Sequence, residues 1–169
     1  AHEMFHHWFG DYVTCESWSN LTLNEGFANY SEYLWLEHKY GKQIADLHRI
    51  EELNGYIQSS YGGIHDLIDY RYEDKEQMFD AHSYNKGGLV LHMLRRYLGD
   101  ETFFAALKLY LTQNAYTDVE AHELRMAFEE VSGEDLNWFF NQWFFKAGHP
   151  KLQVSYNYND QKKQIELTV

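Results

Sequence analysis

Apolar positions recur every three or four residues along most of this chain, a spacing typical of amphipathic helices. Glycines follow several of these runs, and glycine is a common helix end because it adopts the left-handed conformation without strain. The pattern predicts a mainly α-helical protein. The expected helices cover residues 1–9, 22–40, 42–58, 84–98, 100–113 and 118–131, and the aromatic segment 135–148 is expected in the core.

Two segments depart from the helical pattern. Residues 59–83 mix glycines, aromatic residues and charges without a sustained period, which indicates an irregular loop. From Lys151 onward apolar and polar residues alternate, with Asn159 and Asp160 in the middle, which predicts a β-hairpin. Since two strands alone are marginally stable, we expect residues 1–150 to form one domain and 151–169 to begin another.

Composition limits the classes of function. A chain of 169 residues with 44% hydrophobic residues is long enough for one sizeable core. The net charge of -12 argues against a nucleic-acid or anionic-membrane partner, because either would require a basic face. No apolar run reaches the length of a membrane span. The single cysteine, Cys15, excludes an internal disulfide and leaves the cellular compartment open.

Candidate chemistry lies at the start of the chain, in the word His2-Glu3-Met4-Phe5-His6. Histidines four residues apart on a helix project from one face, so both imidazoles can reach one metal ion while Glu3 faces an adjacent water. Glu25 opens the next predicted helix and can supply a third ligand. Two imidazoles and a carboxylate form a three-ligand zinc site with an open position, which is the arrangement of a catalytic zinc.

Other interpretations fit the same residues taken singly. Two histidines on a helix face are often core or surface residues, and Thr22 with Glu25 also fits a capping box. His7 points about 100° away from His6 on a helix and is a poor fourth ligand. Glu32 follows Glu25 by two helical turns, so it could orient a ligand histidine through the outer ring nitrogen or simply be a solvated carboxylate.

The spacing of the motif resembles that of a known family. His2 to His6, eighteen intervening residues and Glu25 match the signature of zinc aminopeptidases of the aminopeptidase N and leukotriene hydrolase type, the gluzincin metallopeptidases. The surrounding words HHWFGD, VTCESW and LNEGFANY are also similar. The resemblance implies that residues 1–150 form the helical half of a thermolysin-like zinc-peptidase domain. It also implies that residues 151–169 begin the β-sandwich that follows in this family.

A second family word implies a further catalytic residue. Tyr84-Asn85-Lys86-Gly87 resembles the Tyr-x-Lys-Gly segment of these enzymes. By this resemblance, the Tyr84 hydroxyl donates a hydrogen bond to the oxyanion formed during peptide hydrolysis, and Glu3 is the general base. His82, two residues before Tyr84, is a weaker candidate for a residue that lines the cleft.

The chain lacks one segment that this family uses to bind its substrate. The family recognises a free amino terminus through a Gly-x-Met-Glu-Asn segment upstream of the zinc motif, and Ala1 alone precedes His2 here. We therefore expect a fragment that needs an N-terminal lobe of the same protein, binds one zinc ion and a peptide substrate, and is inactive alone. Alternatives are a related zinc endopeptidase, an epoxide hydrolase, or a non-catalytic helical interaction module.

Overall fold

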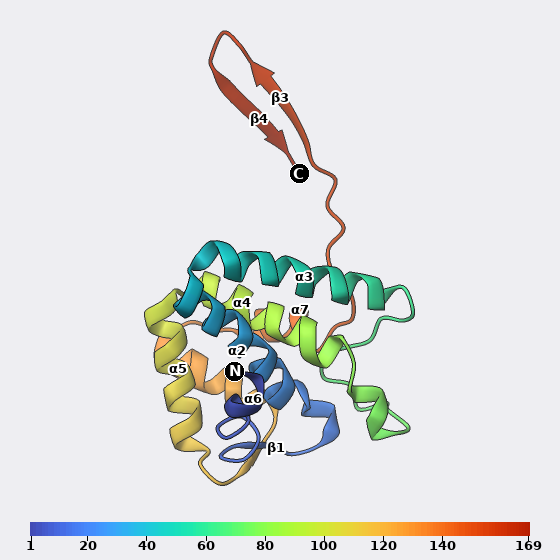
Figure 1. The fold of residues 1–169 in the computed structure, drawn as a ribbon, viewed down its shortest axis with the longest axis vertical. Helices are drawn as coiled ribbons and strands as arrows, with labels where there is room; N and C mark the ends of the chain where they lie inside the picture. Colours follow the sequence, from blue (N-terminus) through green and yellow to red (C-terminus); the bar gives the residue numbers. More distant parts are fainter.

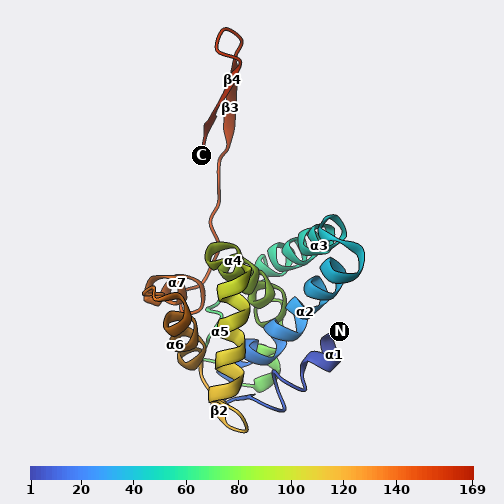
Figure 2. The ribbon, with the colours of Figure 1, turned by 90° about the vertical axis from the view of Figure 1, so that its left-hand side faces the viewer.

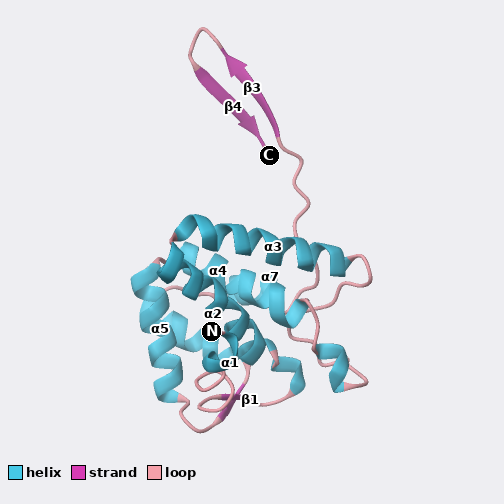
Figure 3. Cartoon of the chain, viewed as in Figure 1, coloured by secondary structure: helices cyan, strands magenta, loops and turns pink.

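Helices dominate the computed structural model, which describes all residues from Ala1 to Val169 (Figures 1 and 3). The α-helices are α1 (His2–Phe5), α2 (Thr22–Tyr40), α3 (Lys42–Ser60), α4 (Gly87–Leu98), α5 (Asp100–Gln113), α6 (Ala121–Ser132) and α7 (Asn137–Trp143). Short 3-10 turns, η1 (Trp18–Asn20) and η2 (Lys75–Met78), and a π-helical turn, η3 (His82–Lys86), complete the helical elements. The strands are β1 (Thr14–Cys15), β2 (Asp118–Val119), β3 (Ser155–Asn159) and β4 (Gln164–Thr168).

The helix α2 lies at the centre of the arrangement. It packs against α1, α3, α4 and η3, while α5 packs against α4 and α6. Figure 2 shows α2 and α3 on one side of the α4–α5 pair and α6 and α7 on the other. One apolar core runs between these layers, and its fully buried members include Phe27, Leu94, Phe103, Phe128 and Phe140. The predicted mainly α fold is therefore confirmed.

The first helix is shorter than the periodicity predicts. The helix α1 ends at Phe5, and the chain then turns tightly, with the Asp11 amide donating to the His6 carbonyl at 2.8 Å. Gly10 adopts a φ of +147°, which permits this reversal. The turn directs Phe9 into the core, where its ring stacks on Phe27 with 4.1 Å between centroids. Burial of Phe9 thus outweighs continuation of the helix.

The predicted helix over 118–131 is also wrong at its start. Asp118 and Val119 form β2, which pairs in parallel with β1, and the helix begins only at Ala121. The Glu120 side chain accepts from the amide of Glu123, whose own side chain accepts from the Glu120 amide. This capping box stops the helix from extending backward.

The C-terminal hairpin is confirmed as an element. Strands β3 and β4 pair antiparallel, from Ser155 opposite Thr168 to Asn159 opposite Gln164. Figure 1 shows the hairpin standing away from the helical body at the end of an extended segment. Its assignment to a separate β-sandwich domain stays a prediction. Among the helices, none has the length and apolar character required to cross a bilayer.

Candidate metal centre

The structure brings His2, His6 and Glu25 together from two elements. His2 lies on α1, His6 directly follows that helix, and Glu25 lies in the first turn of α2. The same carboxylate oxygen, Glu25 Oε2, is 3.2 Å from His2 Nε2 and 3.3 Å from His6 Nε2. All three side chains are mostly shielded from solvent, so the cluster forms a half-buried set of metal-ligating atoms.

Outer hydrogen bonds fix both imidazole rings. His6 Nδ1 donates to the Phe9 carbonyl at 3.0 Å, and His2 Nδ1 donates to Glu32 Oε1 at 3.0 Å. Because Nδ1 carries the hydrogen in each ring, the neutral form directs the lone pair of Nε2 toward Glu25. Metal-bound histidines commonly have such an outer acceptor, which sets the tautomer and the ring orientation.

The separations fit one zinc ion. With bonds of about 2.0–2.1 Å, a tetrahedral zinc places its ligand atoms about 3.3 Å apart, close to the two separations from Glu25. Two imidazole nitrogens and a carboxylate leave a fourth position for water or substrate. The donor set therefore fits a catalytic rather than a closed structural zinc.

The capping-box interpretation of Glu25 does not hold. The helix α2 has Leu21 at its N-cap and no side-chain cap, and the Thr22 hydroxyl donates to the Ser83 carbonyl at 2.9 Å. Glu25 instead turns toward the histidines. The Thr22 bond ties α2 to the turn that carries Tyr84.

Tyr84 lies beside the cluster on η3. Its ring is parallel to that of His2 within 9°, with 6.1 Å between centroids. Burial, followed by the charges of Glu25 and Glu3, raises the pKa of the Tyr84 hydroxyl well above its ordinary range. The hydroxyl therefore stays protonated and can donate a hydrogen bond at neutral pH. Glu3 is exposed on α1 and close enough for its charge to act on Tyr84.

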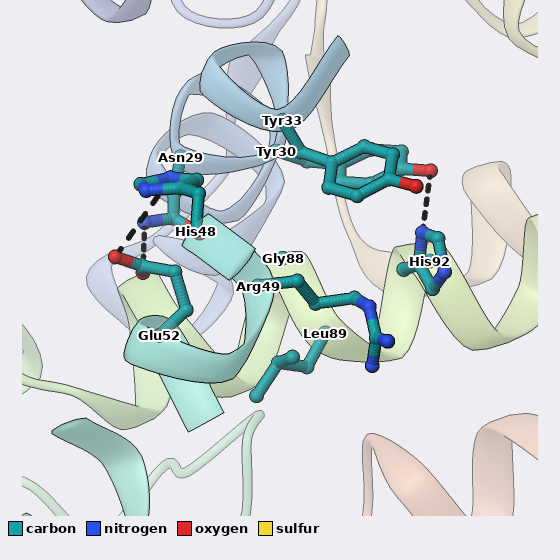
Figure 4. A pocket seen from close by; sticks show the side chains of 9 residues that line it. All are labelled: Asn29, Tyr30, Tyr33, His48, Arg49, Glu52, Gly88, Leu89 and His92. Atoms are coloured by element: carbon teal, nitrogen blue, oxygen red, sulfur yellow. Dashed lines mark hydrogen bonds and ion pairs between the residues drawn. The ribbon is translucent and has the colours of Figure 1, made fainter. Parts of the chain in front are cut away.

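A small pocket between α2, α3 and α4 is lined in part by Asn29, His48 and Glu52 (Figure 4), and His48 also contacts Glu32. His48 Nε2 lies 3.5 Å from Glu32 Oε2 and 4.0 Å from Glu52 Oε1. Glu52 Oε2 accepts from Asn29 at 2.6 Å and from Asn85 at 2.9 Å. This chain of contacts links the carboxylate behind His2 to the residue next to Tyr84.

His48 and Glu52 were not predicted as site residues from the sequence. Glu52 follows His48 by four positions on the polar side of α3, and this spacing is the only signal that could have indicated them. His7 is exposed, lies 3.5 Å from Asp11 and takes no part in the cluster. His82 is buried beside His65 and Asp80 rather than beside the candidate zinc ligands.

Comparison with known proteins identifies the family of this chain. The family model for the peptidase family M1 domain matches residues 1–143. Aminopeptidase M1-A of Oryza sativa subsp. japonica is 36% identical over 99% of the chain. The solved structure of Legionella pneumophila aminopeptidase A with aspartic acid superposes with a TM-score of 0.81 at 28% identity over 98% of the chain. An M1 zinc metallopeptidase from Deinococcus radiodurans gives 0.73 at 31% identity over 89%.

The chain thus has the fold of the helical part of a zinc-peptidase catalytic domain. It belongs to peptidase family M1. It spans only part of its relatives, covering 19% of the rice aminopeptidase, 18% of the Legionella chain and 33% of the Deinococcus chain.

Proposed function

We propose that this chain supplies the zinc-binding and catalytic residues of an aminopeptidase, which removes N-terminal residues from peptides. The observation that carries the proposal is the convergence of two Nε2 atoms on Glu25 Oε2 at 3.2 and 3.3 Å. Membership of family M1 supports the same chemistry, because its relatives are named aminopeptidases and zinc metallopeptidases. His2, His6 and Glu25 are the proposed ligands of one zinc ion.

The remaining residues have distinct roles in this proposal. Zinc, when bound, acts as a Lewis acid and lowers the pKa of a coordinated water. Glu3 accepts a proton from the attacking water and returns it to the leaving amine. The Tyr84 hydroxyl donates a hydrogen bond to the carbonyl oxygen as negative charge develops there. Glu32 holds His2 in the ligating tautomer through its hydrogen bond to Nδ1.

Specificity for a free amino terminus rests on family membership alone. The side chains that would bind the substrate amine are not evident in these 169 residues. We therefore propose that the active enzyme is a longer polypeptide in which an N-terminal lobe completes the substrate cleft, and that this chain alone does not turn over peptides. Efficient hydrolysis of an aminoacyl anilide by the 169-residue chain would contradict this.

Metal analysis tests the zinc centre directly. The chain is expected to retain a zinc ion that depends on Glu25, so Glu25→Gln should lose it while the charge-matched surface variant Glu51→Gln keeps it. In the longer enzyme, acetylation of the substrate amino terminus should abolish cleavage. Equal cleavage of free and acetylated peptides would favour an endopeptidase, and zinc retention by Glu25→Gln would overturn the assignment of ligands.

A further inference from the structure

A second cluster of metal-ligating side chains lies outside the proposed catalytic centre. His65 comes from the loop after α3, Asp80 lies two residues before η3, and His82 is the first residue of η3. His65 Nε2 and His82 Nδ1 are each 2.8 Å from the same oxygen, Asp80 Oδ2. The ligating atoms of all three residues lie within 4.8 Å of one another.

The surroundings orient these side chains as metal ligands are usually oriented. His65 Nδ1 donates to the Asp66 carbonyl at 2.7 Å, which leaves Nε2 as the acceptor nitrogen of the neutral ring. Asp80 Oδ1 accepts from the amides of His82 and Ser83 at 2.9 and 3.1 Å. The other oxygen, Oδ2, is therefore directed at the two imidazoles. The arrangement repeats that of Glu25 between His2 and His6.

His82 is buried, and it turns Nδ1 rather than Nε2 toward Asp80. The His65 and His82 ring centroids are only 3.9 Å apart, which disfavours charging both imidazoles. Two neutral rings beside one carboxylate oxygen form a donor set that a single divalent cation can share.

We propose that His65, Asp80 and His82 form a second metal site for a divalent transition-metal ion that prefers imidazole ligands, such as Zn²⁺, Co²⁺ or Ni²⁺. Separations of 2.8 Å match ligand angles near 90° at bond lengths of about 2.0–2.1 Å, as in five- or six-coordinate sites. A cavity of about 420 Å³, lined in part by Gly62, Gln77 and these three residues, provides an entry path and room for water ligands.

The site would act on the position of Tyr84. The Tyr84 amide donates to the Asp80 carbonyl at 3.1 Å, and His82 and Tyr84 share the same π-helical turn. His65 belongs to the loop between Ser60 and Lys75, much of which is exposed. A metal ion here would tie that loop to the turn that carries Tyr84.

Calorimetric titration of the metal-free chain with Co²⁺ tests the proposal. Wild type should bind two equivalents, and His82→Phe and His65→Gln should each bind one, while His38→Gln at an exposed position should still bind two. Glu25→Gln should retain the equivalent that His82→Phe loses, so the second site is measured independently of the proposed catalytic zinc. Absence of an equivalent that depends on both His65 and His82 would overturn the proposal.

Two further measurements protect this test from folding artefacts. Circular dichroism and thermal unfolding of the metal-free forms establish whether each variant is folded. If the buried substitution His82→Phe prevents folding, the metal stoichiometry of His65→Gln decides the test. Limited proteolysis within residues 61–74 should become at least several-fold slower on addition of Co²⁺ to wild type and to Glu25→Gln. Equal protection in His65→Gln would also overturn the second site.

Discussion

Gly26 of α2 and Gly87 of α4 lie face to face, so close that a methyl group on either would lie 3.1–3.2 Å from the α-carbon of the other. This contact sets the distance between α2, which carries Glu25, and α4, which directly follows the turn η3 that carries Tyr84. Glu25 directly precedes Gly26, and Tyr84 lies one turn before Gly87. The approach of two glycines therefore fixes the position of Glu25, a proposed metal ligand, relative to the proposed oxyanion donor.

Substitution of Gly87 by alanine should separate α2 from α4. The new methyl group would lie 2.1 Å from the Thr22 hydroxyl oxygen and 3.1 Å from the Gly26 α-carbon, so Thr22 must give up its bond to Ser83 and the helices must move apart slightly. We expect the free energy of unfolding to fall by about 1–3 kcal/mol, with a reduced zinc affinity. Chemical denaturation and zinc titration measure both. Gly63→Ala is the matched control, because nothing lies within 4 Å of its new methyl group, and equal effects of the two substitutions would contradict the explanation.

Replacement of Glu3 by glutamine should separate catalysis from metal binding. Glu3 lies outside the His2, His6 and Glu25 cluster, so zinc content is expected to match wild type. Loss of Glu3 as the proposed general base should lower kcat of the longer enzyme by about 10²–10⁴-fold. Steady-state kinetics alongside metal analysis measures this. A variant with normal turnover would show that another group accepts the proton.

Removal of the Tyr84 hydroxyl should affect the transition state more than substrate binding. Tyr84→Phe is expected to reduce kcat of the longer enzyme by about 10²–10³-fold, with little change in KM or zinc content. The control is Tyr61→Phe, at a side chain that is 85% exposed. A change confined to KM would assign Tyr84 to substrate binding instead.

Glu32→Gln should weaken zinc binding without removing a ligand. The amide cannot match the carboxylate that accepts from His2 Nδ1, so zinc affinity should fall by about 10–100-fold. Competition with a chromophoric chelator measures the affinity. Glu51→Gln, an exposed position on α3, should leave it unchanged. Unchanged affinity in Glu32→Gln would make Glu32 a solvated surface carboxylate.

His92 should contribute to the acid sensitivity of the fold. Burial, with the nearby charges of Arg49 and Arg95, lowers the pKa of His92 to about 4. Between the ordinary histidine pKa of about 6.5 and this value, the unfolded chain binds a proton that the folded chain does not. The free energy of unfolding therefore decreases as the pH falls through this range. Denaturation of His92→Leu at several pH values should give a shallower decrease, and an unchanged slope would contradict this.

Local sequence patterns were sufficient for most of the helices. The bounds of α2 and α5 agree with the periodicity, because their apolar spacing and the glycines at 41 and 99 act over a few residues. The pattern failed where distant segments intervene. Strand β1 pairs with Asp118 and Val119 about a hundred residues later, and this long-range pairing displaced the start of α6.

By itself, the sequence determined the histidine pair, the spacing to Glu25, the main helices and the C-terminal hairpin, since each depends on covalent order and local periodicity. Only the tertiary structure decided that Glu25 turns to the histidines rather than caps α2, that His48 lies behind Glu32, and that His65 meets Asp80 and His82. These contacts between side chains depend on how the helices pack and how the loops close. Side chains far apart in the chain converge only after the core is buried, and no local period encodes that convergence.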